Sequence, residues 1–251
     1  MKNLRPDLNG VLVIDKPLRW TSADVCRFIR RGVGGAKVGH AGTLDPLATG
    51  VLVVCLGRAT KQIPTLMDGE KRYAAVIDLS NLSSTDDLEG ELTSVPLPDA
   101  GPPAADRVAG VCAAFVGPIM QSPPAHSAIW INGERAYDKA RRGETLRMTP
   151  RPIIIHSITL LAYAWPILEL DIRCAKGAYI RSLARDIGAS LGVGGMLTAL
   201  RRTRVGPHTL DSALTPEAAV VHAEGHLKPA PLPLTDLPIS STFNPCSSPS
   251  A

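Results

Sequence analysis

The sequence predicts an α+β fold built on a mixed, mostly antiparallel sheet flanked by helices and loops. Predicted strands outnumber predicted helices along the 251 residues. Residues 72–79 and 167–174 alternate apolar and polar side chains, as half-buried strands do. Strands and helices do not alternate regularly, which argues against a doubly wound parallel sheet. A hydrophobic content of 45% is enough for a substantial core in one large domain.

The N-terminal part of the chain predicts two strands with a helix between them. Residues 10–15 form a short apolar run, and residues 51–56 are apolar on both faces, which favours a central strand. Thr21 is an N-cap residue with Asp24 three positions on, the spacing of a capping box. We expect a helix to begin there and to end at Gly32.

The rest of the chain predicts three strands, three helices and a long polar excursion. In chain order we expect a strand over 72–79, a Ser-, Asp- and Pro-rich loop over 80–106, a helix over about 105–115, strands over about 152–161 and 167–174, a helix with apolar positions from Ile180 to Leu191 that Gly192 ends, and a short helix ending at Leu200, Arg201 and Arg202. After about residue 212 the chain becomes weakly acidic and then rich in proline and serine.

Charge is segregated along the chain, whose net charge is +4. Residues 173–204 carry seven Lys or Arg against one acid, whereas residues 78–106 carry seven acids and no base. This pattern favours a basic face for a polyanion such as nucleic acid, although arginine-rich helix faces also serve solubility alone.

Neither a disulfide framework nor a zinc site is indicated. The five cysteines are widely spaced and form no C-x-x-C pair. The first ten residues lack the apolar core of a signal peptide, and no apolar run reaches the ~18 residues of a membrane span. We therefore expect a cytoplasmic protein that makes no membrane contact.

The chemistry of the chain centres on a Gly-rich loop that holds one acid, Asp45. Pro46 disfavours helical backbone at Asp45, so this side chain is held at the mouth of a strand. Asp-Pro is a common turn, and the alternative is a nucleophile, which in a dry pocket needs a nearby cation to stay charged. Arg181 is the natural cation, and Tyr73 and Tyr179 have rings that can stack on a nucleobase. An ordinary helix start remains the other interpretation of Tyr179 and Arg181.

Several motifs together resemble the TruB family of bacterial tRNA pseudouridine synthases, in order from about residue 10 to residue 210. They are Lys16-Pro17 with Thr21-Ser22, residues 39–50 (GHAGTLDPLATG), residues 57–61 (GRATK), Lys71-Arg72-Tyr73, residues 123–128 (PPAHSA), residues 137–141 (YDKAR), residues 176–183 (KGAYIRSL) and residues 200–203 (LRRT). The resemblance implies the pseudouridine synthase fold and isomerisation of the uridine at position 55 of the tRNA T loop, without a cofactor or metal.

The resemblance also implies roles for single residues. Asp45 matches the aspartate that attacks the flipped-out uridine at C1′ or at C6. Tyr73 matches the tyrosine that stacks on the target base, and Arg181 matches the arginine that pairs with the aspartate. Two further residues match walls of the base pocket, Tyr179 and Leu200, and one matches the loop histidine that fills the space of the flipped bases, His40.

The expected RNA contacts lie outside this pocket. Residues 121–151 match an inserted RNA-binding thumb, and we expect RNA contacts from Lys16, Lys61, Arg141, Arg201 and Arg202. The partner is the T stem-loop of tRNA, with no protein partner implied and a monomer expected. We expect residues 1–212 to form the catalytic domain. Residues 213–251 would be a short, partly disordered extension without a full RNA-binding domain of the PUA type.

The chain departs from the family pattern in two internal places. The usual Gly-x-x-Thr-Asp-Thr-x-Asp run is replaced by residues 79–90 (LSNLSSTDDLEG), and Trp130 stands where lysine is common. Three other functions compete with the tRNA synthase: a guide-dependent relative acting on ribosomal RNA, a non-catalytic RNA-binding module, and a carboxylate glycosidase. The last would need a second acid at a set distance, for which the sequence suggests no partner.

Overall fold

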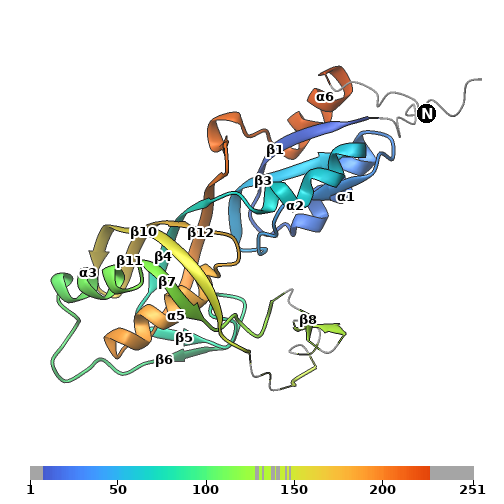
Figure 1. Cartoon of the computed structure of the whole chain (residues 1–251). Coiled ribbons are helices and arrows are strands. Elements are labelled where there is room, and N and C mark those ends of the chain that lie inside the picture. The colour runs from blue at the N-terminus through green and yellow to red at the C-terminus, as the bar shows by residue number, and fades with distance from the viewer. Residues whose placement is uncertain are drawn as a thin grey trace, which may run out of the picture.

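The computed structural model describes residues 8–226 except 128, 129, 132, 137, 138, 140, 141, 145 and 147. It confirms the α+β class, with a mixed sheet and flanking helices (Figure 1). The strands are β1 (Gly10–Lys16), β2 (Val38–His40), β3 (Ala48–Leu56), β4 (Lys71–Asp78), β5 (Asn81–Ser83), β6 (Leu92–Ser94), β7 (Gly117–Gln121), β8 (Trp130–Ile131), β9 (Glu134–Arg135), β10 (Arg151–Ala164), β11 (Ile167–Cys174), β12 (Met196–Val205) and β13 (His208–Thr209). The helices are α1 (Ser22–Gly32), η1 (Gly57–Gln62), α2 (Ile63–Met67), α3 (Ala105–Ala114), α5 (Ile180–Leu191), η2 (Leu210–Ser212) and α6 (Pro216–His226).

One nine-stranded sheet organises the molecule, in the order β1-β3-β12-β4-β11-β10-β7 with β2 beside β3 and β13 beside β12. All its pairs are antiparallel except β12 with β3, which is parallel. Leu56 pairs with both β1 and β2, so these strands lie on opposite edges of β3. The edge that carries β2 therefore also takes β12 near Ala48, and the loop between β2 and β3 lies where the two halves of the sheet meet.

Local sequence determines the predicted N-terminal elements. Thr21 caps α1, its side chain accepting from the backbone N–H of Asp24, whose carboxylate accepts from the Thr21 N–H in turn. This reciprocal pair satisfies two of the helix's free donors. β3 is buried along nearly its whole length, which confirms the central strand, and β4 alternates buried and open positions from Lys71 onward.

The prediction of a short helix ending at residues 200–202 is wrong, because these residues lie in β12. Met, Leu, Ala and Arg favour helices, and local preference alone suggests one. The slot between β3 and β4 offers this segment two ladders of backbone hydrogen bonds, and Leu200 pairs with Ala48 on one side and Ala75 on the other. Tertiary pairing therefore overrides the helical preference.

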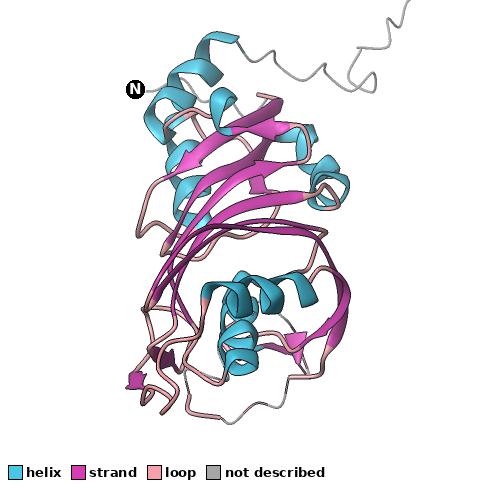
Figure 2. Cartoon of the chain, turned by 90° about the vertical axis from the view of Figure 1, so that its left-hand side faces the viewer, coloured by secondary structure: helices cyan, strands magenta, loops and turns pink. Residues whose placement is uncertain are grey.

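Helices pack against the sheet in both halves of the molecule, and in the half with β1 and β3 they lie on both faces, with α2 on the face opposite α1 (Figure 2). α1 and α6 pack together beside β1, and α3 and α5 pack together beside β10 and β12. The excursion expected as a loop over 80–106 contains the two-stranded sheet of β5 and β6. The predicted C-terminal extension includes the helix α6, which buries Ala219 and Ala223. Residues 227–251, on which the expected disorder falls, lie outside the described residues.

The thumb segment (residues 121–151) stands apart from the sheet where it carries β8 in Figure 1. Its roots are the paired strands β7 and β10, in which Gln121 faces Arg151. Between the roots, β8 and β9 pair with each other as a small separate ribbon. Within the part of the chain that the structure describes, no helix is long and apolar enough to cross a membrane.

Candidate active site

Asp45 is held by its backbone between β2 and β3. The N–H of Ala48, three residues further along the chain, donates to the Asp45 carbonyl at 3.0 Å. On one side, the N–H of Leu44 donates to the Ser22 hydroxyl at 2.9 Å, and that hydroxyl lies 3.1 Å from the Leu44 carbonyl. On the other side, the N–H of Arg19 donates to the Pro46 carbonyl at 2.8 Å. The loop is thus fixed by contacts to the start of α1 as well as by Pro46.

Arg181, at the start of α5, forms an ion pair with Asp45. Its Nε lies 3.0 Å from Oδ2 of Asp45 and 3.5 Å from Oδ2 of Asp87. The Arg181 side chain is only 6% exposed, whereas that of Asp45 is 38% exposed. Arg181 also donates from Nη1 to the Thr85 carbonyl at 2.9 Å and from Nη2 to the His126 carbonyl at 3.0 Å. One buried guanidinium therefore joins the Asp45 loop, the 85–87 loop and the thumb segment.

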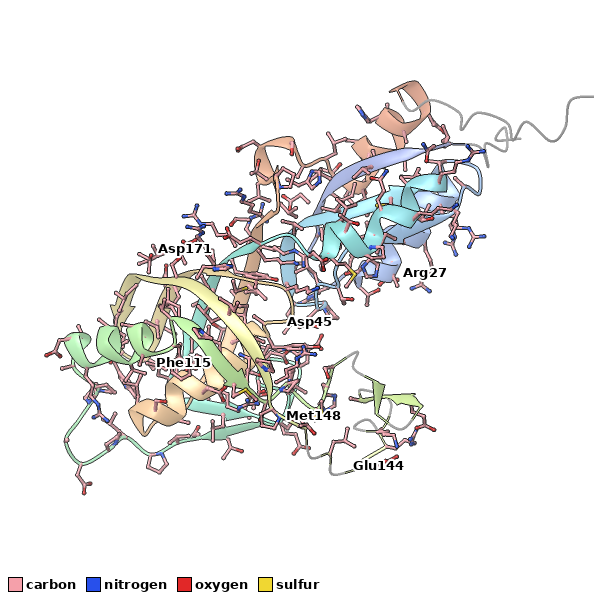
Figure 3. The ribbon with its side chains drawn as sticks, viewed as in Figure 1. Arg27, Asp45, Phe115, Glu144, Met148 and Asp171 are labelled. Carbon is pink, nitrogen blue, oxygen red and sulfur yellow. The ribbon has the colours of Figure 1, made fainter. Side chains whose placement is uncertain are left out.

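A cleft at this ion pair is lined by both charged and apolar side chains. Its lining consists of Asp45, Leu47, Ala48, Asp87, Arg181, Leu197, Thr198, Ala199 and Leu200. Figure 3 shows Asp45 at the junction of the two halves of the molecule, between the positions of Arg27 on α1 and Met148 in the thumb segment. Such a cleft suits a planar, weakly polar group beside a nucleophile.

The environment raises the pKa of Asp45 above its ordinary value. Removal from water is the largest cause, and the negative charge of Asp87 acts in the same direction. Arg181 and Lys16 lower the pKa of Asp45, but they do not offset burial. Arg181 therefore supports the charged carboxylate, as the sequence led us to expect, without bringing its pKa to that of an exposed aspartate.

Tyr73 lies on β4, where the charge of Asp45 influences its hydroxyl. The residue is 8% exposed, and burial raises the pKa of its hydroxyl, with the Asp45 charge contributing in the same direction. Its strand neighbour Arg202 lowers it. Tyr73 is therefore close enough to Asp45 to respond to its charge, although it does not line the cleft wall.

Tyr179 and His40 flank the site without lining the cleft. Tyr179 is the N-cap residue of α5, and its backbone N–H and carbonyl both bond to the buried Gln121 side chain. The guanidinium of Arg151 lies 5.2 Å from the centre of the Tyr179 ring. His40 ends β2 with a buried Nδ1 that has no hydrogen-bond partner among the described atoms. Burial lowers the pKa of His40, so its neutral form is favoured.

Two of the five predicted RNA contacts are incompatible with the burial of their side chains. Lys16 is fully buried, and its Nζ donates to the carbonyls of Pro17 and Trp20 at 2.9 and 2.5 Å. Arg202 is 1% exposed and bonds to the carbonyls of Val51, Thr43 and Gly42. Both cations satisfy carbonyl groups around the Asp45 loop, so they hold the site instead of facing RNA.

The other three predicted contacts differ in placement. Lys61 is exposed on η1. Arg201 is partly exposed, and its Nη2 donates to the Asp15 carboxylate at 2.8 Å. Arg141 lies outside the described residues. RNA contact by Lys61, Arg201 and Arg141 stays a prediction.

Sequence reasoning missed the roles of Asp87 and Arg185. Asp87 is 4% exposed, and its Oδ1 accepts from the Thr85 hydroxyl at 2.5 Å and from the Glu89 N–H at 3.0 Å. Arg185, one turn after Arg181, donates to the Asp86 carboxylate at 2.8 Å and to the Ser122 carbonyl at 3.0 Å. The available clue was a pair of adjacent acids, Asp86 and Asp87, in a polar loop. Their pairing with Arg185 and Arg181 of α5 becomes visible only in three dimensions.

Asp87 is also the second acid that a glycosidase would require. It shares the Arg181 Nε with Asp45, so the two carboxylates lie close together. Asp87 is buried and already accepts two hydrogen bonds, which leaves it poorly placed to protonate a leaving group or activate water. The geometry therefore favours one reactive acid over a pair.

Comparison with known proteins decides the family. The model of the TruB family pseudouridylate synthase N-terminal domain matches residues 30–180, and that of the tRNA pseudouridylate synthase B C-terminal domain matches residues 181–225. The chain belongs to the TruB family. Its membership confirms the resemblance found in the sequence, and the TruB match continues through α6 into the predicted C-terminal extension.

Curated TruB relatives are similar over most of the chain. The chain is 48% identical over 216 residues to tRNA pseudouridine synthase B of Arthrobacter sp. (strain FB24), covering 84% of this chain and 70% of the relative. The corresponding protein of Nocardia farcinica (strain IFM 10152) is 50% identical over 216 residues, with the same coverage. That of Ralstonia pickettii (strain 12J) is 45% identical over 224 residues, covering 88% of this chain and 70% of the relative.

Solved structures show the same fold. A Cbf5 chain in a Cbf5–Nop10–Gar1 complex superposes with a TM-score of 0.67 at 29% identity, covering 87% of this chain and 55% of that one. A chain of an H/ACA RNP bound to a substrate RNA containing 2′-deoxyuridine gives a TM-score of 0.64 at 27% identity, covering 87% of this chain and 54% of that one. The TruB chain thus spans about half the length of these structural neighbours, and the predicted pseudouridine synthase fold is confirmed.

Proposed function

We propose that this TruB-family enzyme converts uridine to pseudouridine at position 55 in the T loop of tRNA, with Asp45 as the nucleophile. The observation that carries the proposal is the Asp45 carboxylate, 38% exposed at a cleft and ion-paired with the buried Arg181. The curated relatives are named as tRNA pseudouridine synthases at 45–50% identity, which supports tRNA as the substrate.

The reaction breaks the N1–C1′ bond of uridine and forms a C5–C1′ bond. Asp45 attacks C1′ of the sugar and displaces N1, or it adds to C6 of the base before the N1–C1′ bond breaks, and on either route the base is then free to turn within the cleft. C5 then joins C1′, the C5 proton leaves, and N1, which has lost its bond to C1′, takes up a proton, so that substrate and product are isomers. No electrons are gained or lost overall. Arg181 stabilises the carboxylate as it leaves the product.

The apolar walls of the cleft suit a base that has left the helical stack. A buried uridine must flip out to reach Asp45, which requires a few kcal/mol and is easiest for a loop base already partly unstacked. Leu200 and Leu197 line the cleft. Tyr73 has an aromatic ring, and its hydroxyl is influenced by the charge of Asp45. We infer that Tyr73 stacks on the base and helps to remove the C5 proton, and that His40, in its neutral form, fills the space the base leaves.

The thumb segment is proposed to close over the T loop. Arg181 binds the His126 carbonyl and Arg185 binds the Ser122 carbonyl, so both anchor the root of the thumb to α5. Shape and stacking recognise RNA loops, while phosphate contacts hold the register. A tRNA substrate also fits the cytoplasmic location predicted from the sequence, and the monomeric state stays a prediction.

The substrate is tested by incubating the enzyme with a T stem-loop RNA and mapping pseudouridine at each position. We expect conversion of the uridine at position 55 alone. A matched stem-loop with cytidine at that position controls for modification elsewhere in the loop. If pseudouridine forms in ribosomal RNA fragments but not in the T loop, the substrate assignment is wrong although the TruB fold stands.

A non-catalytic RNA-binding module is the competing function. Such a module requires no ionised acid at the cleft. The ion pairs of buried Arg181 with Asp45 and Asp87 would then serve only stability. RNA binding without any pseudouridine in either RNA would favour this alternative.

A further inference from the structure

The turn that precedes α1 is clamped against the nucleophile loop. Buried Lys16 donates from Nζ to the carbonyls of Pro17 and Trp20, at both ends of the turn. The backbone N–H of Arg19, at the tip, donates to the carbonyl of Pro46 at 2.8 Å. The tip of the turn is therefore held in place, and it is hydrogen-bonded to the residue that follows Asp45.

Arg19 adopts a backbone conformation that suits glycine. Its φ angle is +67°, and the only other described non-glycine residue at positive φ is Asp86, in the loop that holds Asp87. Left-handed backbone brings Cβ close to the following carbonyl, which disfavours every residue with a side chain and bulky ones most. Asn is better tolerated there, and Gly has no such penalty. Backbone strain of this kind gathers at functional sites, so a long side chain at this position points to a function.

The Arg19 side chain is exposed and has no hydrogen-bond or ionic partner in the part of the chain that the structure describes. The two acids nearest in sequence are engaged elsewhere, Asp15 by Arg201 and Asp24 by Thr21 and Arg27. A guanidinium is always charged, and its fork matches two oxygens of a phosphate. Because the turn is already rigid, binding would restrict only the side chain itself.

We propose that Arg19 binds a phosphate of the RNA strand next to the target nucleotide. The proposal rests on the proposed function, because a flipped uridine in the Asp45 cleft carries its own phosphates at the mouth of that cleft. The backbone of Arg19 lies beside the nucleophile loop, because its N–H donates to the carbonyl of Pro46, the residue that follows Asp45, and its side chain is exposed. Its role is to position the substrate strand, which makes Arg19 a binding residue distinct from those that line the cleft.

The test compares Arg19→Gly with the wild-type enzyme in thermal stability and in RNA binding. If Arg19 had no function in RNA binding, the substitution would leave RNA binding unchanged. The first measurement is thermal unfolding, in which we expect an equal or higher midpoint because the strain is relieved. The second is binding of the T stem-loop RNA over a salt series. We expect Kd at low salt to rise about threefold to tenfold, and the slope of log K against log salt to fall by about 0.7–0.9, the loss of one phosphate contact.

Three further variants make the comparison specific. Arg19→Lys keeps a charge and should retain most of the salt slope, whereas Arg19→Asn tolerates the backbone and should bind as weakly as Arg19→Gly. Arg173→Gln removes an equal charge from the sheet face opposite Tyr73, since Arg173 is exposed and pairs in register with Arg72, and should leave the slope unchanged.

Equal Kd and equal salt slope for wild type, Arg19→Gly and Arg19→Asn would overturn the proposal. Because this comparison measures binding, it does not depend on turnover. A wild-type enzyme that binds the RNA but forms no pseudouridine would contradict the proposed function instead, so the two failures are distinguishable.

Discussion

The guanidinium of Arg181 and the carboxylate of Asp45 meet at 3.0 Å, with Arg181 buried beneath the cleft and Asp45 partly open to it. The same Nε lies 3.5 Å from Asp87, so a single cation serves two acids. Both acids line the cleft, but the Asp45 side chain is partly exposed, whereas that of Asp87 is buried and accepts two hydrogen bonds. This asymmetry supports the proposal that Asp45 is the reactive acid and that Asp87 has a supporting role.

Replacing Arg181 should impair catalysis and stability together. In Arg181→Met two carboxylates lose their cation, and two carbonyls lose a donor. We expect the single-turnover rate to fall roughly 100- to 1,000-fold. The free energy of unfolding should fall by about 3 kcal/mol, at the lower end for a broken buried pair because Asp45 is partly exposed. Rapid-quench kinetics and urea unfolding measure the two effects, and an unchanged rate in a destabilised Arg181→Met enzyme would limit Arg181 to a structural role.

Replacing Asp87 with asparagine should shift the pH dependence of the chemical step toward acid. As the proposed nucleophile, Asp45 must be ionised to attack, so the single-turnover rate should rise with pH through the pKa of Asp45, which lies above its ordinary value. The Asp87 charge raises that pKa, and Asp87→Asn removes the charge while keeping an oxygen for the Thr85 hydroxyl. The midpoint should therefore move to lower pH. Asp68→Asn, an exposed acid paired with Lys176, is the control and should leave it unmoved. A midpoint that rises in Asp87→Asn would contradict the assigned electrostatics.

The burial of Lys16 should appear in the alkaline stability of the protein. Burial lowers the pKa of Lys16 from 10.5 to about 8. Between these values the unfolded chain holds a proton that the folded chain has lost, so raising the pH favours folding. Relative to Lys16→Met, the wild type should gain stability from pH 8 to 10.5, by at most about 3 kcal/mol. Urea unfolding at several pH values measures this difference, and parallel curves for the two proteins would show that Lys16 keeps an ordinary pKa.

Gly50 should be required where β3 meets β12. Its φ angle is +99°, and an added Cβ would collide with the backbone carbonyl of Arg202. Gly50→Ala should reduce the free energy of unfolding by about 3 kcal/mol, because strain and collision act together. Gly101→Ala is the matched control: its φ is +82° but the space around it is open, so it should lose only about 1 kcal/mol. Equal losses in the two variants would mean that the strands separate without difficulty at Gly50.

Elements with complete local patterns were predictable from sequence. The capping box of Thr21 with Asp24 and the alternation that starts at Tyr73 depend on neighbouring residues only, and the structure has both. The strand β12 was not predictable, because its helix-favouring residues become a strand only between β3 and β4. α6 did carry a local pattern that was overlooked: Thr215 accepts from the Ala218 N–H in front of a proline at the first helical position.

The site was predictable as far as family motifs reached. They named Asp45 and Arg181, whose pairing the structure shows at 3.0 Å. They could not show that Lys16 and Arg202 are buried among carbonyl groups, because a basic residue in a sequence does not reveal which way it faces. The contact of Asp87 with Arg181 joins positions almost a hundred residues apart and depends on the packing of α5 against the 85–87 loop.

The nucleophile is tested most directly by Asp45→Asn in a single-turnover reaction with the T stem-loop RNA. The variant is nearly isosteric, so RNA binding should persist while pseudouridine formation falls below detection. Asp68→Asn provides the control for loss of one exposed acid and should retain wild-type turnover. Pseudouridine at position 55 formed by Asp45→Asn at the wild-type rate would contradict the assignment, because an Asp-Pro turn tolerates asparagine and a nucleophile does not.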